Sequence, residues 1–192
     1  MKKLILISFV FVPYLLSAQA AASHADSITA ANNKAKDSVI RHDKDDIDFS
    51  RNLPPRPGTL VTDYTNTLSA KDVQRLGNKL AAFNNLTKAQ IAVVVMRSVG
   101  GVDIMQYGRK LANNWGIGQK GKNNGVLVLI ALNDKKMAIL TGAGLESILP
   151  DSVCHNIITT DFIPYFKKGN YFGGLDKGTN DIINYIDHKK TR

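Results

Sequence analysis

Two nearly continuous apolar runs, at residues 90–99 and 125–132, constrain the fold of this chain more than any other feature. Both are rich in Val, Ile and Leu and lack the polar alternation of a strand with one wet face. Such runs are typical of strands that helices cover on both faces. The segment between them opens with Asp103 and carries apolar residues at helical spacing, at Ile104, Tyr107, Leu111 and Trp115. This order predicts two parallel strands joined by a crossing helix.

A third strand is predicted directly after the second run. Asn133, Asp134 and Lys135 are typical turn residues, and residues 136–140 then form the returning strand of a hairpin. This strand runs antiparallel to the second one, so the sheet is expected to be mixed.

Three further segments predict helices. Ser69 and Asp72 resemble an N-terminal capping pair, and the apolar residues after them have helical spacing, at Val73, Leu76, Leu80 and Phe83. Asp151 is expected to cap a second helix that ends at Pro164. The last helix carries Leu175, Thr179, Ile182, Ile183 and Ile186. We therefore expect an α/β fold, a three-layer α/β/α sandwich with a small central mixed β-sheet.

The N-terminal region divides into two segments before the domain. Residues 1–20 have the pattern of a secretory signal peptide, with Lys2 and Lys3, an apolar run and a small-x-small site that ends at Ala20. Residues 21–57 are polar and predict a flexible tether, and residues 58–192 form the domain. We expect a periplasmic or secreted protein cleaved near Ala20. The alternative is a retained N-terminal membrane anchor.

Most of the net charge of +9 comes from the domain, which contributes +7, because Lys2 and Lys3 add +2 and residues 21–57 carry equal numbers of basic and acidic residues. A basic surface favours anionic lipid, anionic polymer or phosphate-bearing ligands, or is only a solvated surface. Nucleic acid is not an expected partner, because the chain is predicted to be exported and its aromatic residues do not alternate with basic ones.

The hairpin brings two polar loops together. A turn at residues 133–135 places Val126 opposite Gly142, so the loop at residues 121–125 and the exit at residues 142–144 emerge side by side. Glu146 and Asp151 follow the exit. Amide and carboxylate oxygens together suit a hard cation such as Ca²⁺ or Mg²⁺. Turn formation and helix capping are the structural alternatives for the same residues.

Conventional catalytic groups are scarce. Cys154 is the only cysteine and lies in an apolar pattern typical of a small buried residue. His155 is its neighbour on a helix, where adjacent side chains diverge, so the two do not form a nucleophile–base pair. Trp115 is expected to close the apolar stripe of its helix, with ligand stacking as the alternative.

Seven segments of the chain resemble the TPM domain family, and the resemblance spans residues 53–187. The segments are LPPRPG, VTDYTNTLS, QIAVVVMRSVGG, WGIG, KGKNNGVLVLIA, ILTGAGLESILPD and FKKGNYFGGL. The resemblance implies an α/β/α sandwich in an extracytoplasmic domain. Members of the family include a thylakoid protein linked to photosystem II repair, acid phosphatase activity and calcium binding, and an auxiliary subunit of a nematode acetylcholine receptor.

The resemblance also implies site residues, at Asp63, Asn123, Asn124, Gly142, Gly144, Glu146 and Asp151. Of these, Asn123, Glu146 and Asp151 are the expected metal ligands. Asn123 replaces the Asp that is usual in the family, which removes a negative charge and weakens a cation site. A first helix that runs antiparallel to the first strand begins at the end of the sheet opposite the Asn123 loop. Asp63 precedes that helix, so it is expected to lie away from Asn123 unless the entry segment crosses the sheet end.

The expected function is therefore a TPM-domain binding or accessory module that acts on membrane or envelope proteins and has a weak divalent-cation site. The alternative is a calcium- or magnesium-assisted acid phosphatase that hydrolyses phosphomonoesters. The resemblance supports the fold more directly than either activity, because one fold hosts many functions.

Overall fold

The computed structural model of the chain describes residues 7–8 and 53–190. The predicted signal peptide, apart from residues 7–8, and most of the predicted tether lie outside the described residues. The sheet has the strand order β1-β5-β4-β3-β2. The strands are β1 (Ile7–Ser8), β2 (Val61–Asp63), β3 (Gln90–Met96), β4 (Gly125–Ala131) and β5 (Lys136–Thr141). Strands β2, β3 and β4 are parallel, and β5 is antiparallel to β4, which confirms the mixed sheet.

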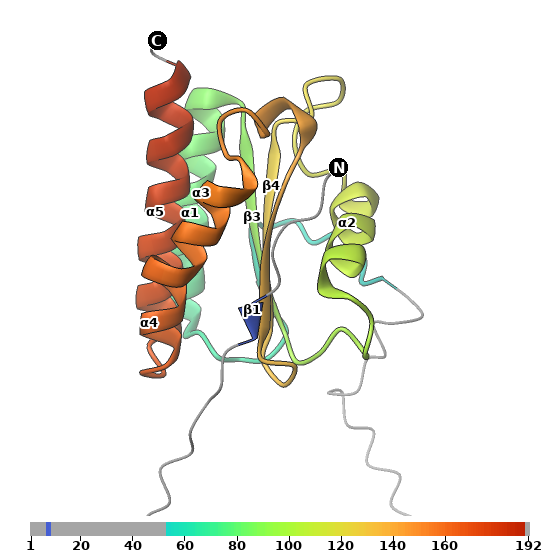
Figure 1. The fold of residues 1–192 in the computed structure, drawn as a ribbon, viewed down its shortest axis with the longest axis vertical. Helices are drawn as coiled ribbons and strands as arrows, with labels where there is room; N and C mark the ends of the chain where they lie inside the picture. Colours follow the sequence, from blue (N-terminus) through green and yellow to red (C-terminus); the bar gives the residue numbers. More distant parts are fainter. Residues whose placement is uncertain (1–6, 9–52, 191–192) are drawn as a thin grey trace, which may run out of the picture. The chain divides into compact units, whose positions relative to one another are not determined.

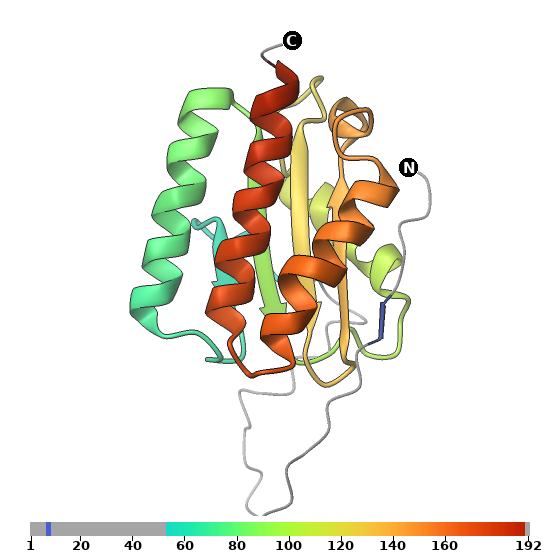
Figure 2. The same cartoon turned by 60° about the vertical axis from the view of Figure 1, so that its left-hand side comes forward.

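Helices cover both faces of this sheet, which confirms the three-layer sandwich (Figures 1 and 2). The helices are α1 (Ala70–Thr87), α2 (Ile104–Trp115), α3 (Asp151–Ile157), α4 (Ile163–Phe166) and α5 (Tyr171–Lys190). Helix α2 lies alone on one face, and the other four lie on the opposite face. The expected caps are present, since Ser69 accepts a hydrogen bond from the backbone of Asp72 and Asp103 accepts one from that of Gln106.

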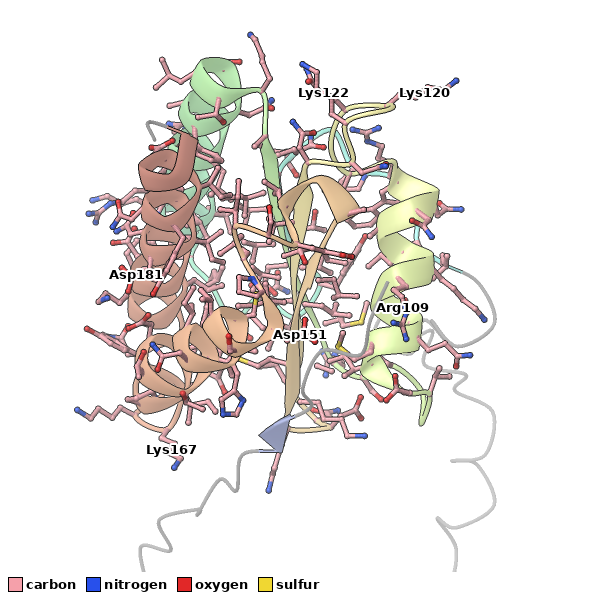
Figure 3. All side chains as sticks on the ribbon, turned by 45° about the horizontal axis from the view of Figure 1, so that its top comes forward. Arg109, Lys120, Lys122, Asp151, Lys167 and Asp181 are labelled. Carbon is pink, nitrogen blue, oxygen red and sulfur yellow. The ribbon has the colours of Figure 1, made fainter. Side chains whose placement is uncertain are left out.

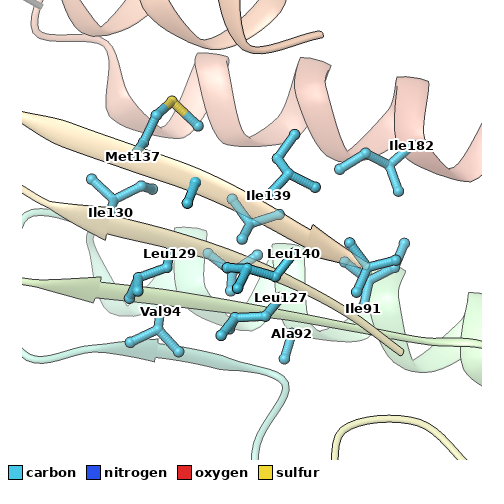
Figure 4. Packing of buried hydrophobic residues seen from close by; sticks show 14 of the residues in the cluster. Ile91, Ala92, Val94, Leu127, Leu129, Ile130, Met137, Ile139, Leu140 and Ile182 are labelled. Carbon is cyan, nitrogen blue, oxygen red and sulfur yellow. The ribbon is translucent and has the colours of Figure 1, made fainter. Parts of the chain in front are cut away.

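The core lies on both sides of the two central strands (Figure 4). Every residue of β4 is buried, and so is every residue of β3 except Gln90. Burial of one Val, Leu or Ile side chain contributes about 1.5–3 kcal/mol, so these two strands and their covering helices dominate the stability of the fold. The apolar runs seen in the sequence therefore have the structure expected of them.

The hairpin register differs from the sequence prediction by one residue. Val126 pairs with Thr141, not with Gly142, because the turn has four residues, 132–135, instead of three. The backbone N–H groups of Leu132 and Asn133 donate to the carbonyls of Met96 (2.9 Å), the last residue of β3, and Arg97 (2.7 Å), which follows it. These bonds hold both residues to the neighbouring strand and lengthen the turn.

Three elements were not predicted correctly. Strands β1 and β2 were missed, because two or three residues are too few for a periodic pattern. The helix after Asp151 does not end at Pro164, because a π-helical segment, η2 (Ile158–Phe162), joins α3 to α4 and places the proline in the first turn of α4. Proline is tolerated there, since the first N–H groups of a helix have no partner within it.

The Asp134 carboxylate fixes the hairpin turn to the exit of β3, accepting hydrogen bonds from the Ser98 hydroxyl (2.7 Å) and the Val99 backbone N–H (2.8 Å). We predict that Asp134→Ala lowers the free energy of unfolding by about 1–3 kcal/mol, because the Val99 N–H loses its partner. Urea denaturation measures the loss. Asn133→Ala in the same turn is the control and should change stability by less than about 0.5 kcal/mol. Equal effects of the two variants would contradict this account.

The π-helical segment η2 holds a buried carboxylate, Asp161, which pairs with Lys177 on α5 at 3.2 Å. Lys177 also pairs with Asp181 at 2.6 Å. Burial raises the pKa of the Asp161 carboxyl above its ordinary value of 3.8, and the nearby Asp181 raises this pKa further, against the opposing effect of Lys177. The folded state therefore holds the Asp161 proton more tightly than the unfolded state does.

This pKa shift predicts a pH-dependent difference between the wild type and Asp161→Asn. As the pH rises from below 3.8 to neutrality, the wild type loses stability by ionising a buried carboxyl, whereas the asparagine cannot ionise. The variant should therefore gain stability relative to the wild type across this range, measured by chemical denaturation at each pH. A stability difference that stays constant with pH would show that the pKa of Asp161 is not raised by folding.

Candidate functional site

The two polar loops lie in contact at the open end of the β4–β5 hairpin. The Gly142 N–H donates to the Gly125 carbonyl (2.8 Å), and the Gly144 N–H donates to the Asn123 carbonyl (3.1 Å). The loop before β4 and the exit after β5 therefore emerge side by side, as the hairpin predicted, although the register is shifted.

The backbones approach so closely that the two exit residues must be glycines. A Cβ atom at Gly142 would overlap the Asn123 carbonyl, and one at Gly144 would overlap the Lys122 carbonyl. Asn123 itself has a φ of 48°, in the left-handed region that asparagine tolerates better than most residues. These three residues thus have a structural reason for their identity whether or not they also contact a ligand.

Asn124 fixes the loop to the rest of the domain. Its side chain is buried, with the carbonyl accepting from the Gln119 N–H (2.8 Å) and the amide donating to the Lys88 carbonyl (2.9 Å). The Gln90 side chain completes this arrangement by accepting from the Gly118 N–H (2.7 Å). Sequence reasoning missed Gln90, and the signal was a polar residue at the head of an otherwise apolar strand.

A cavity of about 200 Å³ lies between α2 and the open end of the hairpin. Its floor is apolar and includes Leu127 and Leu140, and its polar lining comes from Arg109, Asn113, Asn123 and Thr141. Arg109 is half-buried on α2 (Figure 3) and forms no hydrogen bond or ion pair with any described residue. Among the described residues, no acidic side chain lines the cavity, and the guanidinium is the one charged group in its lining.

The acidic residues predicted for the site do not line this cavity. Glu146 is exposed, just beyond the short 3₁₀-helix η1 (Ala143–Leu145). Asp151 lies apart from the loop with Lys120 and Lys122 (Figure 3). It is the first residue of α3, and the expected capping role is wrong, because Pro150 occupies the cap position.

Asp63 lies at the opposite end of the sheet from Asn123. It pairs with Val95 near the end of β3, whereas Gly125 pairs with Gln90 at its start. The Asp63 carboxylate accepts from the backbone N–H groups of Thr65 (2.8 Å) and Leu68 (2.7 Å), which gives it a role in the turn before α1.

Within the described residues, no group of three or more His, Cys, Asp or Glu side chains is placed to hold a metal ion. The Asn124 side chain is buried, and its amide oxygen accepts from the Gln119 N–H. The expected Ca²⁺ or Mg²⁺ site at Asn123, Glu146 and Asp151 stays a prediction.

Cys154 and Trp115 have structural roles. Cys154 is fully buried, and burial raises the pKa of its thiol to about 12, which confirms the expectation of a buried apolar residue. The Trp115 indole is buried at the end of the α2 stripe, and its N–H donates to the Pro54 carbonyl (2.8 Å). Trp115 therefore fixes the segment that leads into β2.

Over the described range, no helix combines the length and the apolar character that crossing a membrane requires.

Comparisons with known proteins agree with this architecture. A family model described as the TPM domain matches residues 61–185, more than half of the chain. The N-terminal domain of a protein from P. gingivalis is 32% identical, with a TM-score of 0.63, over 74% of this chain and 88% of that domain. No curated protein matches the chain significantly.

Two further solved structures share the fold. The N-terminal domain of a protein from Corynebacterium glutamicum is 17% identical, with a TM-score of 0.53, over 68% of this chain and 82% of that domain. A protein from the psychrophilic bacterium Bizionia argentinensis is 20% identical, with a TM-score of 0.56, over 64% of this chain and 83% of that protein.

The role of Asn124 can be tested by Asn124→Ala, which leaves the Gln119 N–H and the Lys88 carbonyl without partners. We predict a loss of about 1–3 kcal/mol in the free energy of unfolding. Asn113→Ala is the matched control, since Asn113 is an exposed asparagine that lines the cavity, and it should change stability by less than about 0.5 kcal/mol. Thermal and urea unfolding measure both variants, and an unchanged stability of Asn124→Ala would refute the structural role.

Proposed function

The chain belongs to the TPM domain family, and from this membership we propose that it is an extracytoplasmic accessory protein that binds membrane or envelope proteins. The observation that carries the proposal is the cavity at the hairpin end, which has an apolar floor and a half-buried guanidinium that pairs with none of the described residues. An apolar pocket with a few convergent polar groups is the usual form of a binding site. The lining residues supply contacts for a ligand but no obvious catalytic pair.

Charge around the cavity supports a binding role. Arg109 favours an anionic group, and Lys120 and Lys122 stand on the adjacent loop (Figure 3). Positive side chains near a site raise the rate at which an anionic partner is encountered, and salt weakens this effect. Anionic lipid or polymer is a second class of partner that the same charge would attract.

The alternative function is a calcium- or magnesium-assisted acid phosphatase. The anion-binding character of the cavity favours it, because a guanidinium also binds phosphate. General acid–base catalysis would require a carboxylate, imidazole or similar group within hydrogen-bond reach of the substrate. The cavity lining contains none of these groups, so the accessory role is the better supported proposal.

Photo-crosslinking in the intact cell tests the accessory role. We predict that the full chain with Asn113→p-benzoylphenylalanine, on the cavity rim, crosslinks to envelope proteins. The full chain with Asn133→p-benzoylphenylalanine, in the turn at the opposite end of the hairpin, should not crosslink to these proteins. Adding Arg109→Glu should abolish the crosslinks from position 113. Equal crosslinking from both positions, or none from position 113, would refute this assignment of the binding face.

Phosphate release from p-nitrophenyl phosphate tests the alternative. The accessory role predicts no turnover by the purified protein in Ca²⁺, Mg²⁺ or chelator. Turnover that depends on the cation and disappears in folded Arg109→Ala would establish the phosphatase instead.

Export is part of the proposal, and it predicts a mature protein that begins near residue 21. Intact-mass measurement of the protein released from the cell envelope checks this. A mature mass that still includes residues 1–20 would favour the N-terminal anchor.

A further inference from the structure

We propose that the cavity at the hairpin end binds the C-terminal carboxylate of a partner protein whose last residue is small and apolar. This inference rests on the proposed binding function and identifies the chemical group that is recognised. Four parts of the chain build the site, namely α2 from Arg109 onward, the loop that follows it, the start of β4 and the exit from β5. Helix α2 and β4 pack through buried side chains, so the cavity is held by the rigid part of the domain.

The charge of the cavity matches a single carboxylate. Arg109 is the only ionisable residue in the lining, and no described residue neutralises it. Its planar guanidinium can donate two parallel hydrogen bonds to one carboxylate, which makes this pair both strong and directional. A phosphate dianion would keep an unbalanced negative charge at the same site, since neither Lys120 nor Lys122 lines the cavity.

The cavity lining also contains a backbone donor. Ala143 lines the cavity, and its N–H makes no hydrogen bond within the described residues. The N–H groups on either side of it, from Gly142 and Gly144, are already used to hold the two loops together. The exit therefore offers one backbone donor at a position that the loop contacts fix.

The size of the cavity suits the terminal residue of a partner peptide. A volume of about 200 Å³ is several times the roughly 30 Å³ that one water molecule occupies in the liquid. It is below the roughly 300–1,000 Å³ of pockets that enclose drug-sized ligands. One terminal residue fits this space, and the apolar floor at Leu127 and Leu140 suits a short aliphatic side chain.

The rest of a bound peptide would leave the cavity past the amides of Asn113 and Asn123, which line its rim. A side-chain amide carries both donors and an acceptor, so these two residues can pair with the N–H and C=O groups of a peptide backbone. An isolated small carboxylate would make no use of them. This is the reason to assign a peptide terminus instead of a free organic acid.

Calorimetric titration of the purified mature protein tests the proposal with four probes. Two are peptides, acetyl-Gly-Ala-Ala with a free C-terminal carboxylate and the same peptide with a C-terminal amide. The other two are N-acetylalanine and inorganic phosphate. We expect the free acid to bind at least about tenfold more tightly than the amide, a difference of about 1.4 kcal/mol. N-acetylalanine and phosphate should also bind more weakly than the peptide acid.

Arg109→Gln should lower the affinity for the peptide acid by about tenfold or more, and Arg109→Lys should restore only part of it, because lysine lacks the planar pair of donors. Arg75→Gln is the control. It removes the same charge from α1, where Arg75 stacks over the Phe172 ring, and should leave the affinity unchanged. Thermal unfolding confirms that each variant is folded, and the comparison of acid with amide requires no variant.

Every other result would contradict the proposal, and each would lead to a different conclusion about the cavity. Equal affinity for the acid and the amide, or no binding of either, excludes carboxylate recognition. Tighter binding of phosphate assigns the cavity to a phosphate ligand, and equal binding of N-acetylalanine assigns it to a small acid. None of these results changes the crosslinking pattern from positions 113 and 133, so failure of this inference is distinguishable from failure of the proposed accessory role.

Discussion

The fold depends on the complete burial of two adjacent parallel strands, β3 and β4. Because neither strand can show a face to water, one helix layer must cover each side, and the short α2 does this alone on one face. Gly108 allows this close packing, since a Cβ atom there would lie 2.7 Å from the Leu140 Cδ1 atom. Hydrophobic burial thus fixes α2 against the hairpin, and the cavity lies where that contact ends.

The polar contacts of the loops depend on this same arrangement. Asn124 and Gln90 can bridge α1, the loop before β4 and the start of β3 because the packed strands bring those three segments together. A hydrogen bond of a buried amide adds modestly to the stability of the fold, whereas a buried donor or acceptor without a partner lowers that stability by more. The loops at this end are consequently defined by satisfied hydrogen bonds, although their sequence resembles that of a flexible Asn- and Gly-rich segment.

The layers and the strand directions could be predicted from the sequence, because long apolar runs and helical spacing directly indicate which residues are buried. It was insufficient where single contacts decide the structure. The bonds of Leu132 and Asn133 to the exit of β3 shift the hairpin register, and nothing in local composition indicates them. Likewise, β2 is recognisable only from its pairing with β3, and the π-helical segment only from the continuity of α3 and α4.

The candidate site was predictable in its location more than in its composition. Hairpin pairing placed Asn123 beside Gly142, and the direction of the first helix correctly placed Asp63 at the far end of the sheet. The cavity itself requires Arg109 and Asn113, which lie on α2 and are brought to the hairpin only by tertiary packing. Neither residue has a sequence pattern that distinguishes it from the other polar positions of a helix.

The hydrogen bonds of Asn124 have a kinetic consequence. They join the loop at Gln119 to the α1 terminus at Lys88, and the Gly144 N–H joins the same loop to the hairpin exit. A loop held at several points loses little conformational entropy when a ligand arrives, so most of the contact energy is retained as affinity. Association at this end of the molecule should then be limited by diffusion and charge, with no slow step of loop ordering.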